Sequence, residues 1–192
     1  MEIEYLTDLQ NFSSTKYDGT IITNKPISIE EILELEKQFN DGKLFPKALR
    51  ELLFLAGGSC ELLDYTIFKQ KELQEFIIEN LKEDGLEIKR PYYVLEAYDA
   101  GSRFYFVYLD EGDNPMVYMA KNDYEELELI KIAATLSAFL SNLIKSHKED
   151  IGRRDDYLKT LEEERERDSQ KTPKTVYSVI KKWVKDIYNK KS

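Results

Sequence analysis

Residues 92–120 read YYVLEAYDAGSRFYFVYLDEGDNPMVYMA. Three segments of this stretch are rich in aromatic and β-branched residues, which favour β-strands; they are residues 92–97, 104–109 and 116–120. The intervening residues 99–102 and 110–115 combine Asp, Gly, Ser, Asn and Pro, a composition typical of turns. The stretch therefore predicts three antiparallel strands joined as a meander, and residues 127–132 predict a further strand.

Helices are predicted on both sides of these strands in the chain, because apolar residues recur there at intervals of three and four. The predicted helices are residues 29–39, 47–56, 71–81 and 135–144. Ser28 and Glu31 form a capping-box pattern at the start of the first helix. Gly57 follows the second helix and can take the left-handed conformation that closes a helix. Leu63, Tyr65 and Ile67 alternate with other residues, so residues 61–68 are expected to be extended.

The composition is that of a globular protein. Of 192 residues, 42% are hydrophobic, which is enough for an ordinary core. The N-terminal ten residues, MEIEYLTDLQ, are acidic and lack the basic and apolar regions of a signal peptide. No stretch approaches the roughly 18 apolar residues that a membrane span needs. We therefore expect a cytoplasmic protein with no membrane partner.

Cysteine and histidine are too few for several kinds of site. The single cysteine, Cys60, excludes an internal disulfide framework and a multi-thiolate metal site. The single histidine, His147, excludes a multi-histidine zinc site and lies in a charged run that does not suit a catalytic triad. Gly57-Gly58 lacks the lysine and spacing of a phosphate-binding loop, and residues 110–115 lack the alternating acids of a calcium loop. No metal or cofactor is predicted.

Charge is divided unevenly along the chain. The whole chain has a net charge of −9, with 28 basic and 37 acidic residues. The first 170 residues carry 21 basic and 36 acidic residues, a net charge of −15, and residues 171–192 carry seven lysines and one aspartate, a net charge of +6. The acidic part disfavours direct binding of nucleic acid, because phosphate contacts need a basic surface.

The C-terminal part predicts a helical extension. Of residues 145–170, sixteen of 26 are charged, as on a solvated helix. Thr172-Pro173 is a typical helix start, and an apolar face follows it, made of Val176, Ile180, Trp183 and Ile187. This face could dock on the acidic domain or form a homodimer, and its lysines could meet an anionic surface. The expected organisation is an N-terminal segment (1–25), an α+β domain (26–145) and a charged helical extension (146–192).

Five pieces of sequence, in order, resemble the SUKH superfamily of SMI/KNR-like domains. They are IEEILELE at 29–36, LFP at 44–46, LRELLFLAGG at 49–58, the aromatic strands at 104–109 and 116–119, and the helix at 135–143. Two details depart from the family pattern. Ala56 stands where many members have Asn before the two glycines, and the Ser-Phe pair that usually precedes the closing helix is absent. The resemblance covers residues 26–145.

The resemblance implies an α+β fold, with an antiparallel β-sheet flanked by helices. Bacterial members are largely immunity proteins, which bind and neutralise a cognate toxin that is often a nuclease. An acidic protein is attracted to the basic cleft of a nuclease, although the same charge also suits solubility alone. Two alternatives stay open: an adaptor of the same fold with a cellular protein partner, and a hydrolase that uses paired carboxylates such as Glu96 and Asp110. The hydrolase lacks a nucleophile–base pair in the sequence, so the protein is expected not to be an enzyme.

The expected partner-binding residues are acidic and aromatic side chains of the strands and turns: Glu96, Asp99, Tyr105, Asp110, Glu111 and Asp113. Ordinary turn chemistry is the alternative explanation for the aspartates, since Asp beside Gly is common in turns. Tyrosines of the strands supply large contact area on binding surfaces, but alternation along a strand sends about half of such residues into the core. The tyrosines concerned are Tyr92, Tyr93, Tyr98, Tyr105, Tyr108 and Tyr118.

Overall fold

The computed structural model describes residues 1–15, 20–65, 68–123 and 125–171. The chain divides into two units, Met1–His147 and Lys148–Ser192. The elements follow in the order α1 (Thr7–Gln10), β1 (Ser14–Thr15), β2 (Ile21–Ile22), α2 (Ile29–Phe39), α3 (Lys47–Ala56), α4 (Gln70–Glu83), β3 (Tyr92–Tyr98), the 3-10 turn η1 (Asp99–Gly101), β4 (Arg103–Tyr108), β5 (Val117–Asn122), β6 (Leu127–Ala133) and α5 (Leu136–Lys171).

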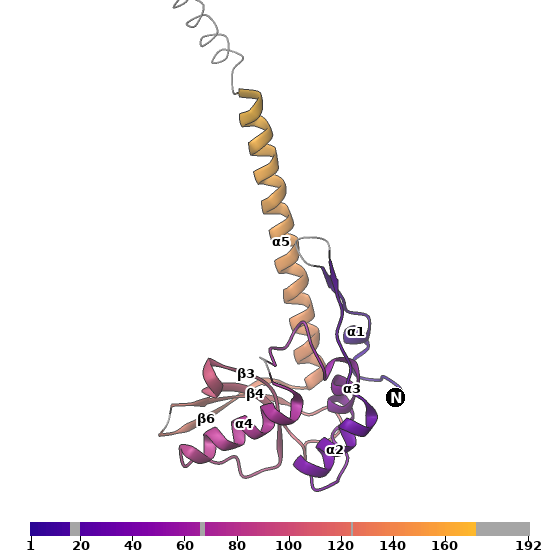
Figure 1. Ribbon diagram of the computed structural model, residues 1–192, viewed down its shortest axis with the longest axis vertical. Coiled ribbons are helices and arrows are strands. Elements are labelled where there is room, and N and C mark those ends of the chain that lie inside the picture. The colour runs from indigo at the N-terminus through magenta and orange to yellow at the C-terminus, as the bar shows by residue number, and fades with distance from the viewer. Residues whose placement is uncertain (16–19, 66–67, 124, 172–192) are drawn as a thin grey trace, which may run out of the picture. The chain divides into compact units, whose positions relative to one another are not determined.

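The predicted meander is confirmed. Strands β3, β4, β5 and β6 form one antiparallel sheet in that order (Figure 1), and β1 pairs with β2 in a separate two-stranded sheet. Register shifts interrupt the sheet twice, between Val94 and Glu96 in β3 and between Val117 and Tyr118 in β5. Strands β3 and β4 are the most buried, with five of seven and four of six residues buried, whereas β6 contains only half-buried and exposed residues. The α+β class expected from the sequence is therefore observed.

Both faces of the sheet are covered. Phe104 and Phe106 lie on one face and are fully buried, because alternate residues of a strand share a face. On the other face, Tyr105 packs against Phe139 of α5, with ring centroids 5.4 Å apart. Helix α4 packs on β3 and η1 and lies in front of the sheet in Figure 1. The Val94 amide of edge strand β3 donates to the Gln74 side-chain oxygen of α4 at 2.7 Å, and the Gln74 side-chain amide donates to the Val94 carbonyl at 2.9 Å.

Helix α2 begins as its sequence predicts. The Glu31 amide donates to the Ser28 hydroxyl at 3.1 Å, and the Ser28 amide donates to the Glu31 carboxylate at 2.8 Å. The predicted role of Gly57 is wrong in one respect: it caps α3, but with a right-handed φ of −65°. Glycine is needed there for space, because a Cβ atom would lie 2.6 Å from the Leu53 carbonyl oxygen.

The predicted extended segment at 61–68 does not form a strand in its described part. Leu63 and Tyr65 are both buried, so their alternation reflects packing of a bent chain on the core. The Asp64 amide donates to the buried Glu96 carboxylate at 2.9 Å, and the Phe68 amide donates to the Tyr65 carbonyl at 3.1 Å. These bonds satisfy backbone groups without a neighbouring strand.

The N-terminal segment is tied to helix α3 by a buried carboxylate. The Glu51 side chain is fully buried and accepts hydrogen bonds from the amides of Glu4, Tyr5 and Leu6, at 2.8 to 3.0 Å. Three amide donors satisfy the charged group, which would otherwise be costly to bury. The first residues of the chain are therefore held next to α3.

The structure describes the second unit only up to residue 171, and this described part is the C-terminal portion of helix α5. Residues 148–167 are mostly exposed and charged, as the sequence predicts for a solvated helix. The amphipathic face predicted at 176–187, with its docking, homodimer and anionic-surface alternatives, lies outside the described residues. None of the helices in the described residues combines the length and the apolar composition of a membrane span.

Candidate protein-binding site

Residues 110–114, which join β4 to β5, are called the acidic loop here. Its fold is fixed by backbone hydrogen bonds at both ends. The Leu109 amide donates to the Pro91 carbonyl at 2.9 Å, and the Ala48 amide of α3 donates to the Asp113 carbonyl at 2.8 Å. Because this backbone is pre-organised, its acidic side chains need little ordering to meet a partner.

One arginine holds the first half of the acidic loop. Arg90 lies 2.5 Å from an Asp110 carboxylate oxygen and 3.2 Å from one of Glu111, and its guanidinium stacks 3.8 Å above the Tyr108 ring. The hydrogen bond from Arg90 lowers the pKa of Asp110. The Tyr118 hydroxyl donates to Glu111 at 3.0 Å. Two of the three acids are therefore held in place by an ion pair, which leaves Asp113 as the loop acid without one among the described residues.

Asp99 lies at the opposite end of the sheet. It belongs to η1, where Tyr98 of β3 pairs with Arg103 of β4, and its carboxylate forms an ion pair with Arg103. The acidic loop follows the other end of β4. At about 3.3 Å per residue, the six residues of β4 separate the two turns by about 20 Å. The structure thus groups Asp110, Glu111 and Asp113 but does not bring Asp99 to them.

Glu96 is buried in the sheet, with 2% of its surface exposed. Burial raises the pKa of Glu96, and its hydrogen bonds with Tyr98 and the Asp64 amide oppose that rise. Tyr105 pairs with Glu96 across the strands and is half-buried. The Glu96 carboxylate contacts Asp64 and Tyr98, whereas the Asp110 carboxylate contacts Arg90 beyond the end of β4, so these two carboxylates share no partner among the described residues.

The strand tyrosines divide between core and surface. Tyr93 and Tyr108 are buried, and burial raises the pKa of Tyr92 to about 12. Tyr98 is the exposed member of the set and packs edge-on against Tyr105. Most of these rings therefore contribute to packing, as alternation along the strands leads one to expect.

A groove lies beside the acidic loop, and no sequence pattern predicted it. We call it the Leu44 groove; its volume is about 520 Å³, and residues from the N-terminus, the loop before α3 and the acidic loop line it. Asp110 and Asp113 are among them, so two of the predicted contact residues face a concave surface. The groove combines segments far apart in sequence, which pattern analysis could not bring together.

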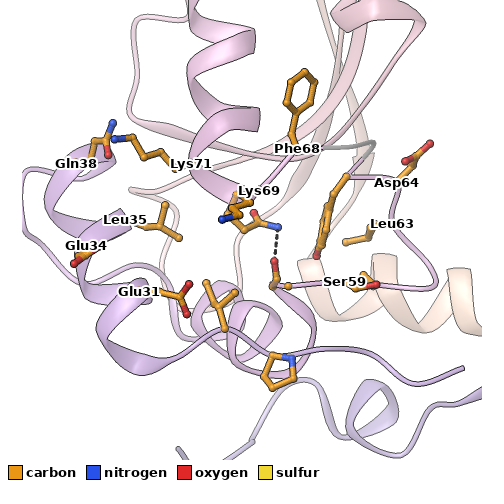
Figure 2. A pocket seen from close by; sticks show the side chains of 17 residues that line it. Glu31, Glu34, Leu35, Gln38, Ser59, Leu63, Asp64, Phe68, Lys69 and Lys71 are labelled. Atoms are coloured by element: carbon orange, nitrogen blue, oxygen red, sulfur yellow. Dashed lines mark hydrogen bonds between the residues drawn. The ribbon is translucent and has the colours of Figure 1, made fainter.

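A second pocket, of about 670 Å³, lies between α2 and the chain that leads into α4. In Figure 2, α2 supplies one wall with Glu31, Glu34 and Gln38, and Lys69 and Asp64 lie across from it. None of the six predicted contact residues lines this pocket. Its lining carries charges of both signs.

The structure brings together one serine and the single histidine. Ser14 Oγ lies 2.9 Å from His147 Nε2, and the Phe12 ring packs edge-on against the imidazole at 5.5 Å. Ser14 is buried, with 4% exposed, so its hydroxyl is not available to a substrate. The pair ties β1 to α5 within the first unit. Among the described residues, no group of three or more His, Cys, Asp or Glu side chains is placed to hold a metal ion.

Comparison with known proteins identifies the family. The model of the SMI1/KNR4 family (SUKH-1) matches residues 26–142, which run from the chain before α2 to the first turns of α5. This range contains the whole meander and the acidic loop, and it covers more than half of the chain. No curated protein and no solved structure matches the chain significantly. The resemblance seen in the sequence is thus confirmed, and the chain belongs to the SMI1/KNR4 family (SUKH-1).

Proposed function

We propose that this protein is an immunity protein, which binds a cognate toxin and neutralises it without catalysis. Membership of the SMI1/KNR4 family is the observation that carries the proposal. The charge supports it further, because the first 170 residues have a net charge of −15. A nuclease toxin binds phosphate through a basic cleft, and an acidic protein is steered toward such a cleft at long range.

The contact surface in this proposal is the acidic loop. Asp110, Glu111 and Asp113 lie together on one pre-organised loop, whereas Asp99 is at the other end of the sheet and Glu96 is buried. Asp110 and Glu111 keep fixed positions through Arg90, and Asp113 presents its carboxylate beside a groove. Such an arrangement can occupy a phosphate-binding cleft as a surrogate anion. The cytoplasm, where a delivered nuclease would act, is the proposed location.

The proposal predicts that a toxin gene lies next to the gene for this chain, and the toxin domain encoded there is the partner to test. Co-expression should restore growth of cells that make the toxin domain. In calorimetry at low salt, the triple variant Asp110→Asn, Glu111→Gln, Asp113→Asn should bind an inactive toxin domain at least 100-fold more weakly, with a smaller salt dependence. Glu162→Gln, Glu163→Gln, Glu164→Gln on α5 is the matched control, because it removes the same three charges elsewhere.

Two outcomes would contradict the proposal. If cells die equally with and without this protein, it is not the immunity protein of that toxin, and the adaptor function becomes the better explanation. If protection holds but the loop variant and the α5 control bind equally well, net charge acts without a specific acidic surface. Ser14→Ala should leave protection unchanged, because Ser14 is buried and is given no catalytic part.

A further inference from the structure

The Leu44 groove joins an exposed apolar side chain to an acidic rim. Leu44 is 62% exposed, although its neighbour Phe45 is buried in the core. Met1 is also exposed at the groove, and Leu109 and Pro46 contribute to its lining. Exposed leucines are common singly, but one set in a concave surface beside a second apolar side chain is typical of a contact site.

Leu44 is held in this position by its neighbours. The Asn40 side-chain amide donates to the carbonyls of Lys43 and Leu44, at 3.1 and 3.0 Å. The Phe45 amide donates to the buried Glu36 carboxylate at 2.8 Å. The loop backbone is therefore anchored on both sides of Leu44. A side chain presented on a fixed backbone loses little conformational freedom when a partner covers it.

The lysine and arginine side chains that line the groove are already paired within this chain. Lys47 forms an ion pair with Glu4, and Arg50 Nε lies 3.0 Å from a carboxylate oxygen of Glu36. Two acids of the lining differ from them: none of the ion pairs found in the described ranges includes Glu2 or Asp113. The groove thus offers carboxylates without an ion pair next to apolar surface, and its lysine and arginine side chains are paired from inside the chain.

We propose that the Leu44 groove takes a segment of the toxin in which an apolar side chain adjoins a lysine or arginine. The apolar side chain packs on Leu44 and Met1, and the basic group meets Glu2 and Asp113. This inference rests on the proposed function and adds the chemistry of the contact. The complementary charge favours this occupant over a second copy of the chain, because two copies would bring the same acids together.

The test measures binding of the purified, inactive toxin domain to the full-length protein. Leu44→Lys should weaken binding at least 100-fold, because it removes the apolar contact and places a cation opposite the toxin's basic group. Leu33→Lys is the matched control, because Leu33 is 48% exposed on α2 and lies outside the groove. This variant should bind the toxin domain as tightly as the wild type does. Asp113→Asn should weaken binding about tenfold at low salt and less at high salt. Circular dichroism and thermal unfolding check that each variant is folded.

The outcomes separate the two proposals. Wild-type binding with no loss in Leu44→Lys overturns the groove and leaves the immunity function standing. Failure of the wild type to bind the toxin overturns both. If the free wild type is a dimer and Leu44→Lys makes it a monomer, the groove is a contact between copies of this chain and the inference is wrong.

Discussion

Two turns of the meander, those that join β3 to β4 and β4 to β5, have similar sequences and different surroundings. The turn η1 and the acidic loop both contain aspartate and a glycine with positive φ, Gly101 at +89° and Gly112 at +81°. A Cβ atom at Gly101 would lie 2.6 Å from Asn80 Nδ2 of α4, whereas a Cβ atom at Gly112 would meet nothing within 4 Å. One turn is packed beneath a helix, and the other has room to receive a partner.

This difference shows that turn composition alone does not identify a binding surface. At η1, Asn80 donates to the Ala100 carbonyl at 3.1 Å, and the Asn122 amide donates to the Ser102 carbonyl at 2.7 Å. At the acidic loop, the backbone bonds leave the tip open and an arginine positions two carboxylates. The same residue types serve packing at one end of the sheet and display charge at the other.

The largest effect on stability is expected at Gly101, and the same substitution at Gly112 is the comparison. Gly101→Ala should lower the free energy of unfolding by about 3 kcal/mol, because strain at positive φ adds to a clash with α4. Gly112→Ala should lower it by about 1 kcal/mol, from strain alone. Urea unfolding of both variants measures the difference. Equal losses would show that the two turns are packed alike.

A smaller effect is expected from removing the charge of Arg90. Arg90→Met, which keeps an apolar side chain near Tyr108, should lower the free energy of unfolding by about 1 kcal/mol at pH 7, since these ion pairs are partly exposed. The pKa of Asp110 is lower in the folded protein than in the unfolded chain, where it is about 4. The stabilisation by the Asp110 carboxylate is therefore fully present above the unfolded pKa and is lost as the pH falls through the lower folded pKa.

The measurement is urea unfolding of wild type and Arg90→Met between pH 7 and pH 2. Their stabilities should converge as the pH falls below about 4. A difference that stays constant over this range would mean that packing of Arg90 on the tyrosine ring, and not its charge, stabilises the acidic loop.

The smallest effect is expected at the other turn. Asp99→Asn should change the free energy of unfolding by less than about 0.5 kcal/mol, because the ion pair with Arg103 is exposed and asparagine tolerates the positive φ of this position. Thermal unfolding measures the change, and Asp110→Asn is the matched variant in the acidic loop. A larger loss in Asp99→Asn than in Asp110→Asn would reverse the comparison.

Much of the fold could be predicted from local pattern. The four strands and the helices α2, α3 and α4 lie close to their predicted ranges, because each shows the apolar period of its element. Helix α5 begins near its predicted start but runs on to Lys171, through the charged residues predicted as a solvated helix. Segment 61–68 was mispredicted because Leu63 and Tyr65 alternate for packing on the core without a partner strand. The charged residues of the acidic loop were predicted, but the Leu44 groove was not, since it combines the N-terminus with two distant loops.

The amino-acid sequence by itself determined the antiparallel meander and the capped helices, because these follow from neighbouring residues and their period. It also determined the acidic charge and the family resemblance, which follow from composition and from the order of short motifs. The tertiary structure decided which of the predicted acids share a surface. Glu96 faces the core, and β4 holds Asp99 away from the acidic loop. The tertiary structure also gives that loop its fixed position, because the contacts of Arg90 with Tyr108 and of α3 with Asp113 join segments that are distant in the chain.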